Sequence, residues 1–447
     1  MNAFKAYDIR GVYNRDFNKD DVYKVGFFIP RLLKTNKVLI GRDVRTSSIE
    51  IFEYLCKGIT DSGADVYNTG LATTPMIYWG TAQYGFDASV MITASHNPKE
   101  YNGLKVSASN ALPVGYDSGL SDLEQMVLNE KIEPVTLKGK IIENDFRNDY
   151  LAFQKEKLND ISNLNIAVDV SNGMAGLFIR DILGDNPHYI FEDLDGTFPN
   201  HEANPLKPEN IVDAQKLVEK TKADIGVIFD GDADRVMFVD ENSRFISPDL
   251  MIAFLANHFL KERKEGVRVL QDIRTSKAVG EYIAKFNGEM HMWRVGRAYA
   301  ALKLREIDGL FGGELAGHYY FKEFFYSDSG LMAASLILNI LSDLKKQGIS
   351  LSEAIAEIEV YKNSGEINFK IEKKQEAMDA VIAHFKSQGT PDAFYDFDGY
   401  RIEFADWWLN IRPSNTEPYL RFLAEAKTTE LLNKIVTEST DIIKSFS

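Results

Sequence analysis

Cysteine is nearly absent from the sequence, and long apolar runs are missing. The 447 residues contain one cysteine, Cys56, so no intramolecular disulfide can form, which is typical of cytoplasmic proteins. No uninterrupted apolar run approaches the ~18 residues that a membrane-spanning helix requires. The first residues also lack the apolar core of a signal peptide. We therefore expect a cytoplasmic protein that has no membrane partner.

Positive charge is in deficit as well. The 51 lysines and arginines are outnumbered by 66 aspartates and glutamates, which gives a formal net charge of −15. Such a chain lacks the basic surface that binds nucleic acids or anionic membranes. We therefore expect no nucleic-acid partner. An anionic small molecule would need arginines that are gathered at one place in the fold.

Apolar segments alternate with segments of helical periodicity through most of the chain. This pattern predicts parallel or mixed α/β sheets. It restarts near residue 164 and again near residue 249, so we predict three similar mixed α/β domains. The end of the chain alternates like an exposed sheet and predicts a C-terminal α+β domain. The four predicted domains are 1–150, 151–260, 261–365 and 366–447.

A serine is predicted to lie at the end of a buried strand. The apolar segment 86–92 runs into Thr-Ala-Ser-His-Asn-Pro at positions 93–98. Pro98 fixes its own φ and keeps Asn97 out of the helical region, so Ser95 lies in a tight turn. A hydroxyl placed in this way can act as a nucleophile when a neighbouring group activates it. The alternative is a structural turn that uses these side chains for local hydrogen bonds.

Three carboxylates follow a second apolar strand, at 223–229. Asp230, Asp232 and Asp234 alternate along a tight loop, and like charges this close repel one another. A divalent cation would relieve the repulsion, and oxygen ligands suit Mg²⁺. An EF-hand is excluded because Arg235 stands where that loop requires glycine. A phosphatase with Asp230 as its nucleophile and a solvated acidic loop are the alternatives that stay open.

Two further loops carry groups that suit a sugar phosphate. Gly-Glu-Leu-Ala-Gly-His at 313–318 places Glu314 and His318 among small residues, where a carboxylate can accept hydrogen bonds from sugar hydroxyls. The alternative for His318 is a structural histidine. Arg-Pro-Ser-Asn-Thr-Glu-Pro at 412–418 combines an arginine, hydroxyls, an amide and backbone N–H groups. That combination favours a phosphate clamp over an ordinary polar turn.

Together with Tyr-Asp-Ile-Arg-Gly at 7–11, these motifs resemble the α-D-phosphohexomutase superfamily, and most closely its phosphomannomutase/phosphoglucomutase branch. The resemblance covers the whole chain and implies four domains around a central cleft. It implies an isomerase that interconverts hexose 1-phosphate and hexose 6-phosphate through a phosphoserine enzyme and a hexose 1,6-bisphosphate. The bisphosphate must turn around in the site, and a mobile C-terminal domain would let the cleft open for that turn.

The resemblance also implies a role for each motif. Ser95 would be the phosphoserine, and one of its phosphate oxygens would join Asp230, Asp232 and Asp234 in holding one Mg²⁺ per chain. The groups implied to support the transferring phosphoryl group and its proton movements are Arg10, His96, Lys105 and Arg235. The groups implied to bind the substrate are Tyr7, Arg297, Glu314, His318, Arg412, Ser414, Asn415, Thr416 and Arg421.

Two positions depart from the family pattern. Ala316 stands where serine is common, and Arg297 stands where histidine is frequent. Both departures bear on the sugar more than on the reaction; the remaining motifs favour a hexose over an amino sugar and leave mannose and glucose open. The alternatives are a phosphoglucosamine or other phosphosugar mutase, an Asp230 sugar phosphatase and a non-catalytic sugar-phosphate-binding protein. We expect a monomer or a homodimer.

Overall fold

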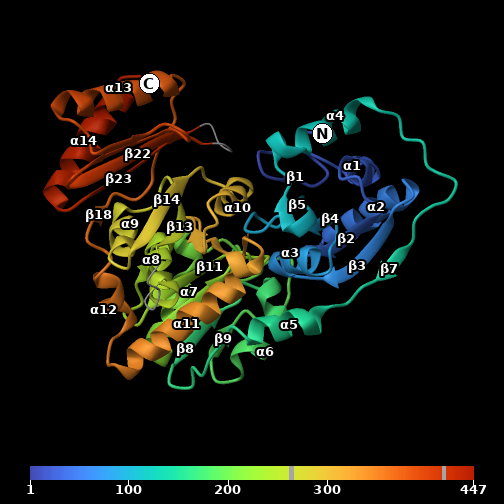
Figure 1. Ribbon diagram of the computed structural model, residues 1–447, viewed down its shortest axis with the longest axis horizontal. Coiled ribbons are helices and arrows are strands. Elements are labelled where there is room, and N and C mark those ends of the chain that lie inside the picture. Colours follow the sequence, from blue (N-terminus) through green and yellow to red (C-terminus); the bar gives the residue numbers. More distant parts are fainter. Residues whose placement is uncertain (261–265, 415–418, 447) are drawn as a thin grey trace.

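Strands in the described part of the chain form four separate sheets. The computed structural model describes residues 1–260, 266–414 and 419–446, and over these residues three sheets are mixed and the fourth is antiparallel (Figure 1). This confirms the prediction of three mixed α/β domains followed by a C-terminal α+β domain. We keep 1–150, 151–260, 261–365 and 366–447 as the proposed limits of domains I to IV.

The first three sheets share one strand order. In each, the first core strand pairs in parallel with the second on one side and with the third on the other, and a fourth strand runs antiparallel beside the third. In domain I these strands are β2 (Lys37–Arg42), β3 (Asp65–Leu71), β4 (Ala88–Ile92) and β5 (Tyr101–Ala108). In domain II they are β8 (Ile166–Asp169), β9 (His188–Ile190), β10 (Ile225–Phe229) and β11 (Val236–Asp240). In domain III they are β13 (Val267–Asp272), β14 (Gly288–Trp293), β15 (Phe311–Gly313) and β16 (Tyr319–Phe321).

The repeated order places three predicted site motifs at equivalent positions. The Ser95 motif follows β4, the acidic motif follows β10, and the Glu314 motif follows β15. Each motif is thus the connection between the third and fourth core strands of its domain. The similarity of the three domains, which the sequence predicted, therefore explains why chemically different loops are presented at corresponding places.

Shorter strands and the helices complete these domains. The added strands are β1 (Ile9–Val12) and β6 (Leu112–Pro113) beside β5, β7 (Ile141–Glu143) beside β3, β12 (Phe245–Ile246) beside β11 and β17 (Ser327–Asp328) beside β16. The α-helices are α1 (Lys19–Leu32), α2 (Ser48–Asp61), α3 (Thr74–Gln83), α4 (Leu120–Asn129), α5 (Arg147–Lys155), α6 (Ile179–Leu183), α7 (Val212–Thr221), α8 (Pro248–Phe259), α9 (Lys277–Ala284), α10 (Arg297–Glu306), α11 (Gly330–Lys346) and α12 (Leu351–Ala356). Single 3₁₀ turns occur at η1 (Ser109–Ala111), η2 (Tyr116–Ser118), η3 (Met174–Leu177), η4 (Pro208–Asn210) and η5 (Lys322–Phe324).

One cluster of buried apolar side chains extends through domains I, II and III, and domain I also buries a second cluster of its own around α1 and α2. Helix α11 is apolar on almost every side, because it packs against α8 and against β11 of domain II. The same cluster of buried side chains includes Trp79 of α3, Phe229 of β10, Phe254 of α8 and Leu336 of α11. Apolar burial of this kind is the main stabilising force in folding, so it fixes the three domains relative to one another.

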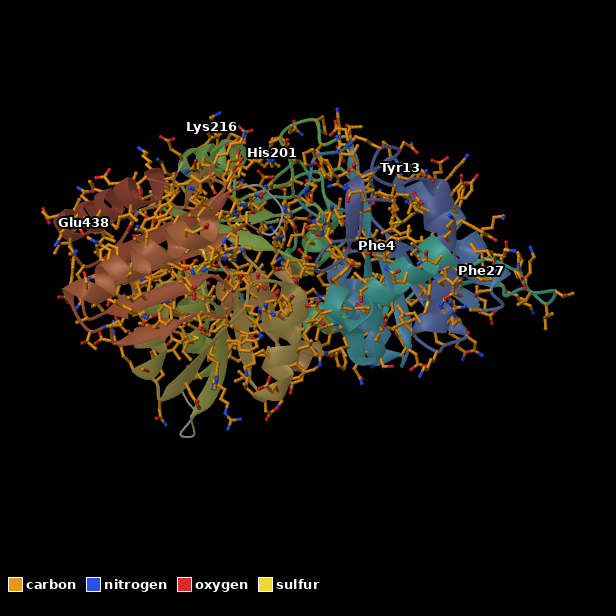
Figure 2. The ribbon with its side chains drawn as sticks, turned by 90° about the horizontal axis from the view of Figure 1, so that it is seen from above. Phe4, Tyr13, Phe27, His201, Lys216 and Glu438 are labelled. Atoms are coloured by element: carbon orange, nitrogen blue, oxygen red, sulfur yellow. The ribbon has the colours of Figure 1, made fainter. Side chains whose placement is uncertain are left out.

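Domain IV has a sheet and a core of its own. Its strands are β18 (Lys362–Asn363), β19 (Ile367–Phe369), β20 (Ala393–Tyr395), β21 (Tyr400–Phe404), β22 (Trp407–Pro413) and β23 (Leu420–Ala426), and its helices are α13 (Lys374–Gln388) and α14 (Thr429–Lys444). The two helices pack on one face of the sheet and bury Phe385, Phe422 and Ile435 between the layers. Figure 2 shows domain IV, marked by Glu438, and domain I, marked by Phe27, at opposite ends of the molecule. No helix in the described ranges is both long enough and apolar enough to cross a membrane.

Candidate active site

The turn after β4 holds Ser95 in the left-handed region of backbone conformation. Its φ is 50°, and its side chain is buried. A non-glycine residue is strained there, so its contacts must hold it in place. The Ser95 N–H donates to Thr93 Oγ1 at 2.9 Å, and Ser95 Oγ donates to Asp230 Oδ2 at 2.6 Å. His96 Nδ1 lies 3.3 Å from the same Oγ, so the hydroxyl faces both an acidic loop and a ring nitrogen.

A buried arginine, Arg45, organises the backbone of this turn. Its guanidinium donates to four carbonyl oxygens of the turn, those of Ser95 (2.8 Å), Asn97 (2.6 Å), Pro98 (2.7 Å) and Tyr101 (3.1 Å). Asp43 Oδ2 lies 3.2 Å from Arg45 Nε, and the ring of Phe198 from domain II covers the guanidinium at 5.0 Å. Sequence reasoning did not single out Arg45. Its one signal was its position in a polar loop that follows a buried strand.

The acidic loop brings Asp230, Asp232 and Asp234 together. Their carboxylate oxygens lie within 4.8 Å of one another, and all three side chains are buried. Burial, followed by the charges of Asp234 and Asp232, raises the pKa of Asp230 well above its usual value. One oxygen each of Asp232 and Asp234 has no hydrogen-bond partner among the described residues. A cluster of this kind could hold a metal ion.

Two further groups contact Asp232 and Asp234. Lys105 Nζ lies 2.7 Å from Asp232 Oδ2 and 2.5 Å from Asp234 Oδ2. Burial lowers the pKa of Lys105, but the two carboxylates outweigh it and raise that pKa well above its usual value, so the lysine is a fixed cation. Thr74 at the start of α3 donates its hydroxyl to Asp232 Oδ2 at 2.5 Å. Sequence reasoning missed Thr74, because nothing local marks it as a partner of a residue in domain II.

Arg10 and His96 complete the surroundings of the Ser95 turn. Arg10 pairs with Asp8 and donates to Asn97 Oδ1 at 2.8 Å. Burial lowers the pKa of Arg10, but Asp8 and the carboxylates of the acidic loop raise this pKa by a larger amount. The net shift is therefore upward. Burial, then the charges of Arg235 and Arg10, lower the pKa of His96 well below its usual value, so its ring is neutral. A neutral ring nitrogen next to Ser95 Oγ can accept a proton.

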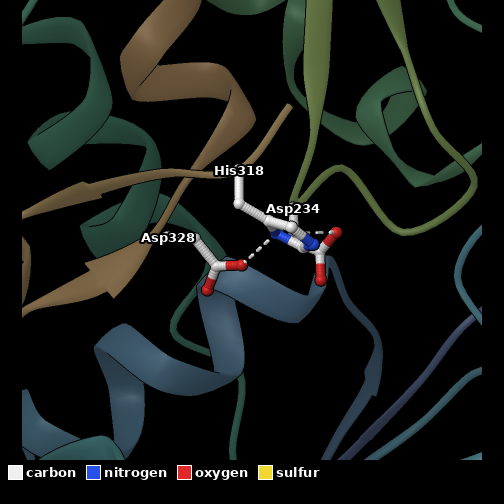
Figure 3. Close-up of side chains that lie close together, drawn as sticks. All are labelled: Asp234, His318 and Asp328. Carbon is white, nitrogen blue, oxygen red and sulfur yellow. Dashed lines mark hydrogen bonds and ion pairs between the residues drawn. The ribbon is translucent and has the colours of Figure 1, made fainter. Parts of the chain in front are cut away.

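His318 lies between the acidic loop and the end of β17 (Figure 3). Its Nδ1 is 2.6 Å from Asp328 Oδ2 and 3.8 Å from Asp234 Oδ1, and its Nε2 accepts from Arg235 Nε at 2.9 Å. Arg235 Nε also lies 3.9 Å from Asp230 Oδ2. The sequence predicted His318 and Arg235 but gave no signal for Asp328.

Arg297 contacts residues of two domains. Its Nε donates to Asp328 Oδ1 at 3.2 Å, and its Nη2 donates to the Ala111 carbonyl at 3.3 Å. The guanidinium also lies over the ring of Tyr78 in domain I, 3.5 Å from the ring centre. The arginine that departs from the family pattern therefore links the sugar-loop side of domain III to domain I.

Glu314 is buried beside a second cation. Its Oε1 accepts from the Tyr320 hydroxyl at 2.6 Å, and its Oε2 lies 4.0 Å from Arg274 Nη2. Arg274 is held by Asp272, with Nη2 donating to Asp272 Oδ2 at 2.8 Å. Burial raises the pKa of Glu314 above its usual value. Arg274 follows β13 directly, which places it at the same edge of the sheet as Glu314.

The arginines of domain IV lie on paired strands. Arg412 of β22 is the register partner of Arg421 of β23. Arg412 Nη1 lies 3.4 Å from Asp398 Oδ2, Arg421 Nη1 lies 3.1 Å from Glu366 Oε1, and the Ser414 N–H donates to the Tyr419 carbonyl at 2.9 Å. Burial, and then the repulsion from the nearby charge of Arg274 in domain III, lower the pKa of Arg412. The predicted residues Asn415 and Thr416 lie outside the described residues.

The structure gathers the predicted residues into two groups. The first surrounds Ser95 and contains Arg10, His96, Lys105, Asp230, Asp232, Asp234, Arg235 and His318. Arg412 and Arg421 form the second group on paired strands of domain IV, and Asp398, the partner of Arg412, also accepts from the Val295 N–H of domain III at 2.9 Å. Ser414 follows Arg412 in the same domain, and Glu314 lies beside Arg274 in domain III. Tyr7, from the N-terminal motif, donates its hydroxyl to the Val295 carbonyl at 2.9 Å and so also reaches domain III. The roles assigned to these residues stay predictions.

Models of one protein family match each of the four domains. The models that match are phosphoglucomutase/phosphomannomutase alpha/beta/alpha domain I at residues 1–131, domain II at 147–243, domain III at 247–361 and the C-terminal domain at 366–442.

Relatives of known sequence and of known structure match nearly the whole chain. A phosphomannomutase from Methanocaldococcus jannaschii is 36% identical over 454 residues, which cover 99% of this chain and 98% of that protein. A protein described as phosphohexose mutases from Xanthomonas campestris is 34% identical over 442 residues, covering 96% and 95%. The crystal structure of a phosphoglucomutase/phosphomannomutase family protein from Burkholderia thailandensis has a TM-score of 0.89 at 28% identity and covers 99% and 97%.

Proposed function

The chain belongs to the phosphoglucomutase/phosphomannomutase family, and we propose that it is a hexose-phosphate mutase that carries a phosphoryl group on Ser95. The observation that carries the proposal is the 2.6 Å hydrogen bond from Ser95 Oγ to Asp230, which joins a strained nucleophile turn in domain I to the acidic loop of domain II. A second arginine-rich group lies at domain IV, as a substrate with a phosphate remote from the reacting centre requires.

The acidic loop fits a Mg²⁺ ion. All of its ligand atoms are carboxylate oxygens, and one buried oxygen each of Asp232 and Asp234 makes no hydrogen bond to a described residue. We propose that Asp230, Asp232 and Asp234, with an oxygen of phosphorylated Ser95, hold one such ion per chain. A bound Mg²⁺ supplies positive charge to the transferring phosphoryl group.

Fixed cations of the chain itself supply the remaining charge. Arg10 donates to Asn97 in the Ser95 turn, Lys105 pairs with Asp232 and Asp234, and Arg235 lies against the acidic loop. The sugar hydroxyl attacks phosphorus while the bond from phosphorus to Ser95 Oγ breaks, and a hexose 1,6-bisphosphate forms. The proton that the sugar hydroxyl loses is balanced by the proton that Ser95 Oγ gains, so Ser95 ends this step as a free hydroxyl. The reverse transfer from the other end of the bisphosphate restores the phosphoserine. Stabilisation of the charge on the three phosphoryl oxygens is the main demand that this reaction makes on a protein.

Domain III and domain IV would hold the rest of the substrate. We propose that Glu314 and His318 contact the sugar, and that Arg412, Ser414 and Arg421 hold the phosphate that does not react. Arg274, whose Nη2 lies 4.0 Å from Glu314 Oε2, would contact the same part of the substrate. Because one chain contributes every residue of this scheme, it operates equally in a monomer or a homodimer.

Phosphorus NMR tests the proposed function. Purified protein with Mg²⁺ and a trace of glucose 1,6-bisphosphate receives mannose 1-phosphate in one tube and glucose 1-phosphate in another. We expect the 6-phosphate to appear while total phosphate ester stays constant, and the relative rates identify the preferred sugar. We expect no conversion by Ser95→Ala, which is the matched control.

Other outcomes would contradict the proposal. Release of inorganic phosphate that survives in Ser95→Ala would identify Asp230 as the nucleophile of a phosphatase. An unchanged spectrum with both sugars and with glucosamine 1-phosphate would favour a binding protein that does not catalyse the reaction.

A further inference from the structure

Three side chains from two domains form a linear chain of hydrogen bonds beside the acidic loop. Asp328 Oδ2 lies 2.6 Å from His318 Nδ1, and His318 Nε2 lies 2.9 Å from Arg235 Nε. Asp328 ends β17, His318 precedes the neighbouring strand β16, and Arg235 ends the acidic loop. All three side chains are buried or nearly so, because Asp328 is fully buried and the side chains of His318 and Arg235 are 10% and 12% exposed.

The chain of bonds determines which ring nitrogen of His318 carries the proton. A guanidinium nitrogen is always a donor, so His318 Nε2 must present its lone pair to Arg235. The ring proton must then be on Nδ1, where the Asp328 carboxylate accepts it. The opposite tautomer would direct two N–H groups at each other across the Arg235 contact and leave Asp328 facing a lone pair.

Asp328 is itself held in place from a second side. Its Oδ1 accepts from Arg297 Nε at 3.2 Å, and Arg297 in turn lies over Tyr78 of domain I. The backbone next to Asp328 packs directly on the acidic loop, because the Gly330 N–H donates to the Ala233 carbonyl at 3.1 Å. A Cβ atom at Gly330 would lie 2.8 Å from the Arg235 carbonyl, which shows how closely the segments approach. The carboxylate is therefore fixed relative to Arg235.

We propose that Asp328 is a positioning residue: it keeps His318 in the Nδ1–H form, and His318 in turn orients the Arg235 guanidinium toward the phosphoryl group on Ser95. Arg235 makes no hydrogen bond through Nη1 or Nη2 to any described residue, so both nitrogens are available to phosphoryl oxygens. This inference rests on the proposed function. Arg297 lies at a position where histidine is frequent in the family. In this chain its guanidinium anchors the second oxygen of Asp328.

The tautomer can be measured without any assay of turnover. Long-range ¹H–¹⁵N spectra of protein labelled with ¹⁵N-histidine distinguish the two neutral forms, and His318→Gln assigns the signal. At a pH at which the ring is neutral, we expect wild-type His318 to carry its proton on Nδ1. A proton on Nε2 in the wild-type protein would overturn the inference, whatever the activity.

Kinetics of Asp328→Asn test whether the tautomer matters. We expect kcat to fall about 10- to 100-fold, by comparison with the loss that follows when a group orienting a metal-binding histidine is removed. We expect KM to change much less, because the scheme gives Asp328 no substrate contact of its own and Asp328 acts only by orienting His318. Ser327→Ala alters the neighbouring residue of the same strand and should leave both constants unchanged.

A double-mutant cycle separates positioning from general damage. If Asp328 acts through Arg235, then Asp328→Asn should cost little in an Arg235→Met background, and the two effects should not add. Full additivity, which means an equal fold loss in both backgrounds, would overturn the inference. If Asp328→Asn fails to fold, Arg297→Gln loosens the same carboxylate from the other side and takes its place in the cycle. A wild-type protein with the expected tautomer but no mutase turnover would instead overturn the proposed function.

Discussion

The two sides of the site are attached to the molecule in different ways. Domains I, II and III, which supply Ser95 and the acidic loop, share one continuous cluster of apolar side chains. Domain IV, which supplies Arg412 and Arg421, buries a separate cluster. The reacting side of the site therefore belongs to domains that share buried apolar side chains, although domain I has a second cluster as well, whereas the distal side belongs to a domain that shares none of them.

Polar contacts, together with the stacked rings of Trp293 and Phe397, join domain IV to domain III. Arg401 Nη1 donates to the Ile273 carbonyl at 2.8 Å and to the Thr275 carbonyl at 2.5 Å. Ser276 Oγ donates to Glu425 Oε2 at 2.6 Å, and a backbone carbonyl of domain IV accepts from Lys277 Nζ at 2.9 Å. Polar interfaces between domains exchange partners with water more easily than apolar cores do.

The difference suits the two tasks of a phosphohexomutase. Transfer from Ser95 requires groups fixed to within a fraction of an ångström, which an apolar core provides. A bisphosphate that turns around requires the opposite, namely a side that opens and closes again. We infer that domain IV rotates on its polar junction while domains I to III stay together.

Removal of the metal ion should stop the chemistry without moving domain IV. We expect a chelator to reduce turnover at least about 1,000-fold, because a divalent cation at a transferring phosphoryl group contributes several kcal/mol. Added Mg²⁺ should restore the activity. Small-angle scattering should show the same particle dimensions before and after, since the metal ligands belong to domains I and II. A change in dimensions would show that the acidic loop also controls domain IV.

Arg45→Met should lower turnover by releasing the backbone of the Ser95 turn. Without the guanidinium, four carbonyl groups of the Ser95 turn lose their partner, and the strained serine is no longer held. We expect kcat to fall about 100-fold, because even a small misplacement of a reacting group can reduce the rate by that much. Circular dichroism should confirm that the variant is folded. Arg15→Met, which removes an exposed arginine from the same domain, is the control. Equal turnover in the two variants would contradict the role given to Arg45.

Arg401→Met should weaken the polar junction and spare the chemistry. The buried guanidinium gives two hydrogen bonds to domain III, and bonds to charged groups contribute about 1.5–3 kcal/mol each. We expect KM to rise about tenfold while the rate at which bisphosphate phosphorylates Ser95 changes little, and scattering should show a more open particle. Lys427→Met removes an exposed cation within domain IV as the control. A loss confined to kcat would place Arg401 on the reacting side instead.

The junction should loosen as the pH rises. Burial, followed by the charge of Asp249, raises the pKa of Glu425 from 4.5 to about 7, although Ser276, Trp408 and Asn363 donate to its carboxylate. The folded protein therefore binds this proton more tightly than the unfolded chain does. The resulting stabilisation is complete below pH 4.5 and is lost as the pH rises through about 7, a total of about 3 kcal/mol.

Thermal unfolding of wild type and Glu425→Gln across this pH range measures the effect. Glutamine cannot ionise, so we expect the stability difference between the two proteins to change in favour of the variant as the pH rises. Parallel curves would show that Glu425 keeps its ordinary pKa. Among the changes proposed here, Glu425→Gln should alter turnover least, because near neutral pH Glu425 of the wild-type protein is already partly protonated.

The parts of the site that the sequence predicted are those with a local signal. Ser95 and the three aspartates each follow an apolar strand within a short loop, and the connection after such a strand lies at the edge of the sheet whichever way the domains pack. The same reasoning predicted Glu314 and the α/β repeats. Domain duplication could be proposed from the alternating pattern, and the shared strand order of the three sheets now supports it in detail.

The parts that the sequence did not predict depend on packing between distant segments. Arg45 lies 50 residues from Ser95 in the chain, and Thr74 lies 158 residues from Asp232. Asp328 is preceded and followed by serine in a segment without a motif, so its contact with His318 becomes visible only when β16 and β17 pair. Charge alone could not indicate these partners either, because buried and exposed carboxylates look alike in a sequence.

The most direct test of the account is whether Ser95 itself carries the phosphoryl group. Protein treated with glucose 1,6-bisphosphate in the presence of Mg²⁺, quenched and digested, is examined by mass spectrometry of the peptide that contains residues 93–98. We predict one phosphate on Ser95, lost again when hexose 1-phosphate or hexose 6-phosphate is added in excess, and no phosphate on Ser95→Ala. An acid-labile phosphate on Asp230, with Ser95 unmodified throughout turnover, would contradict the account.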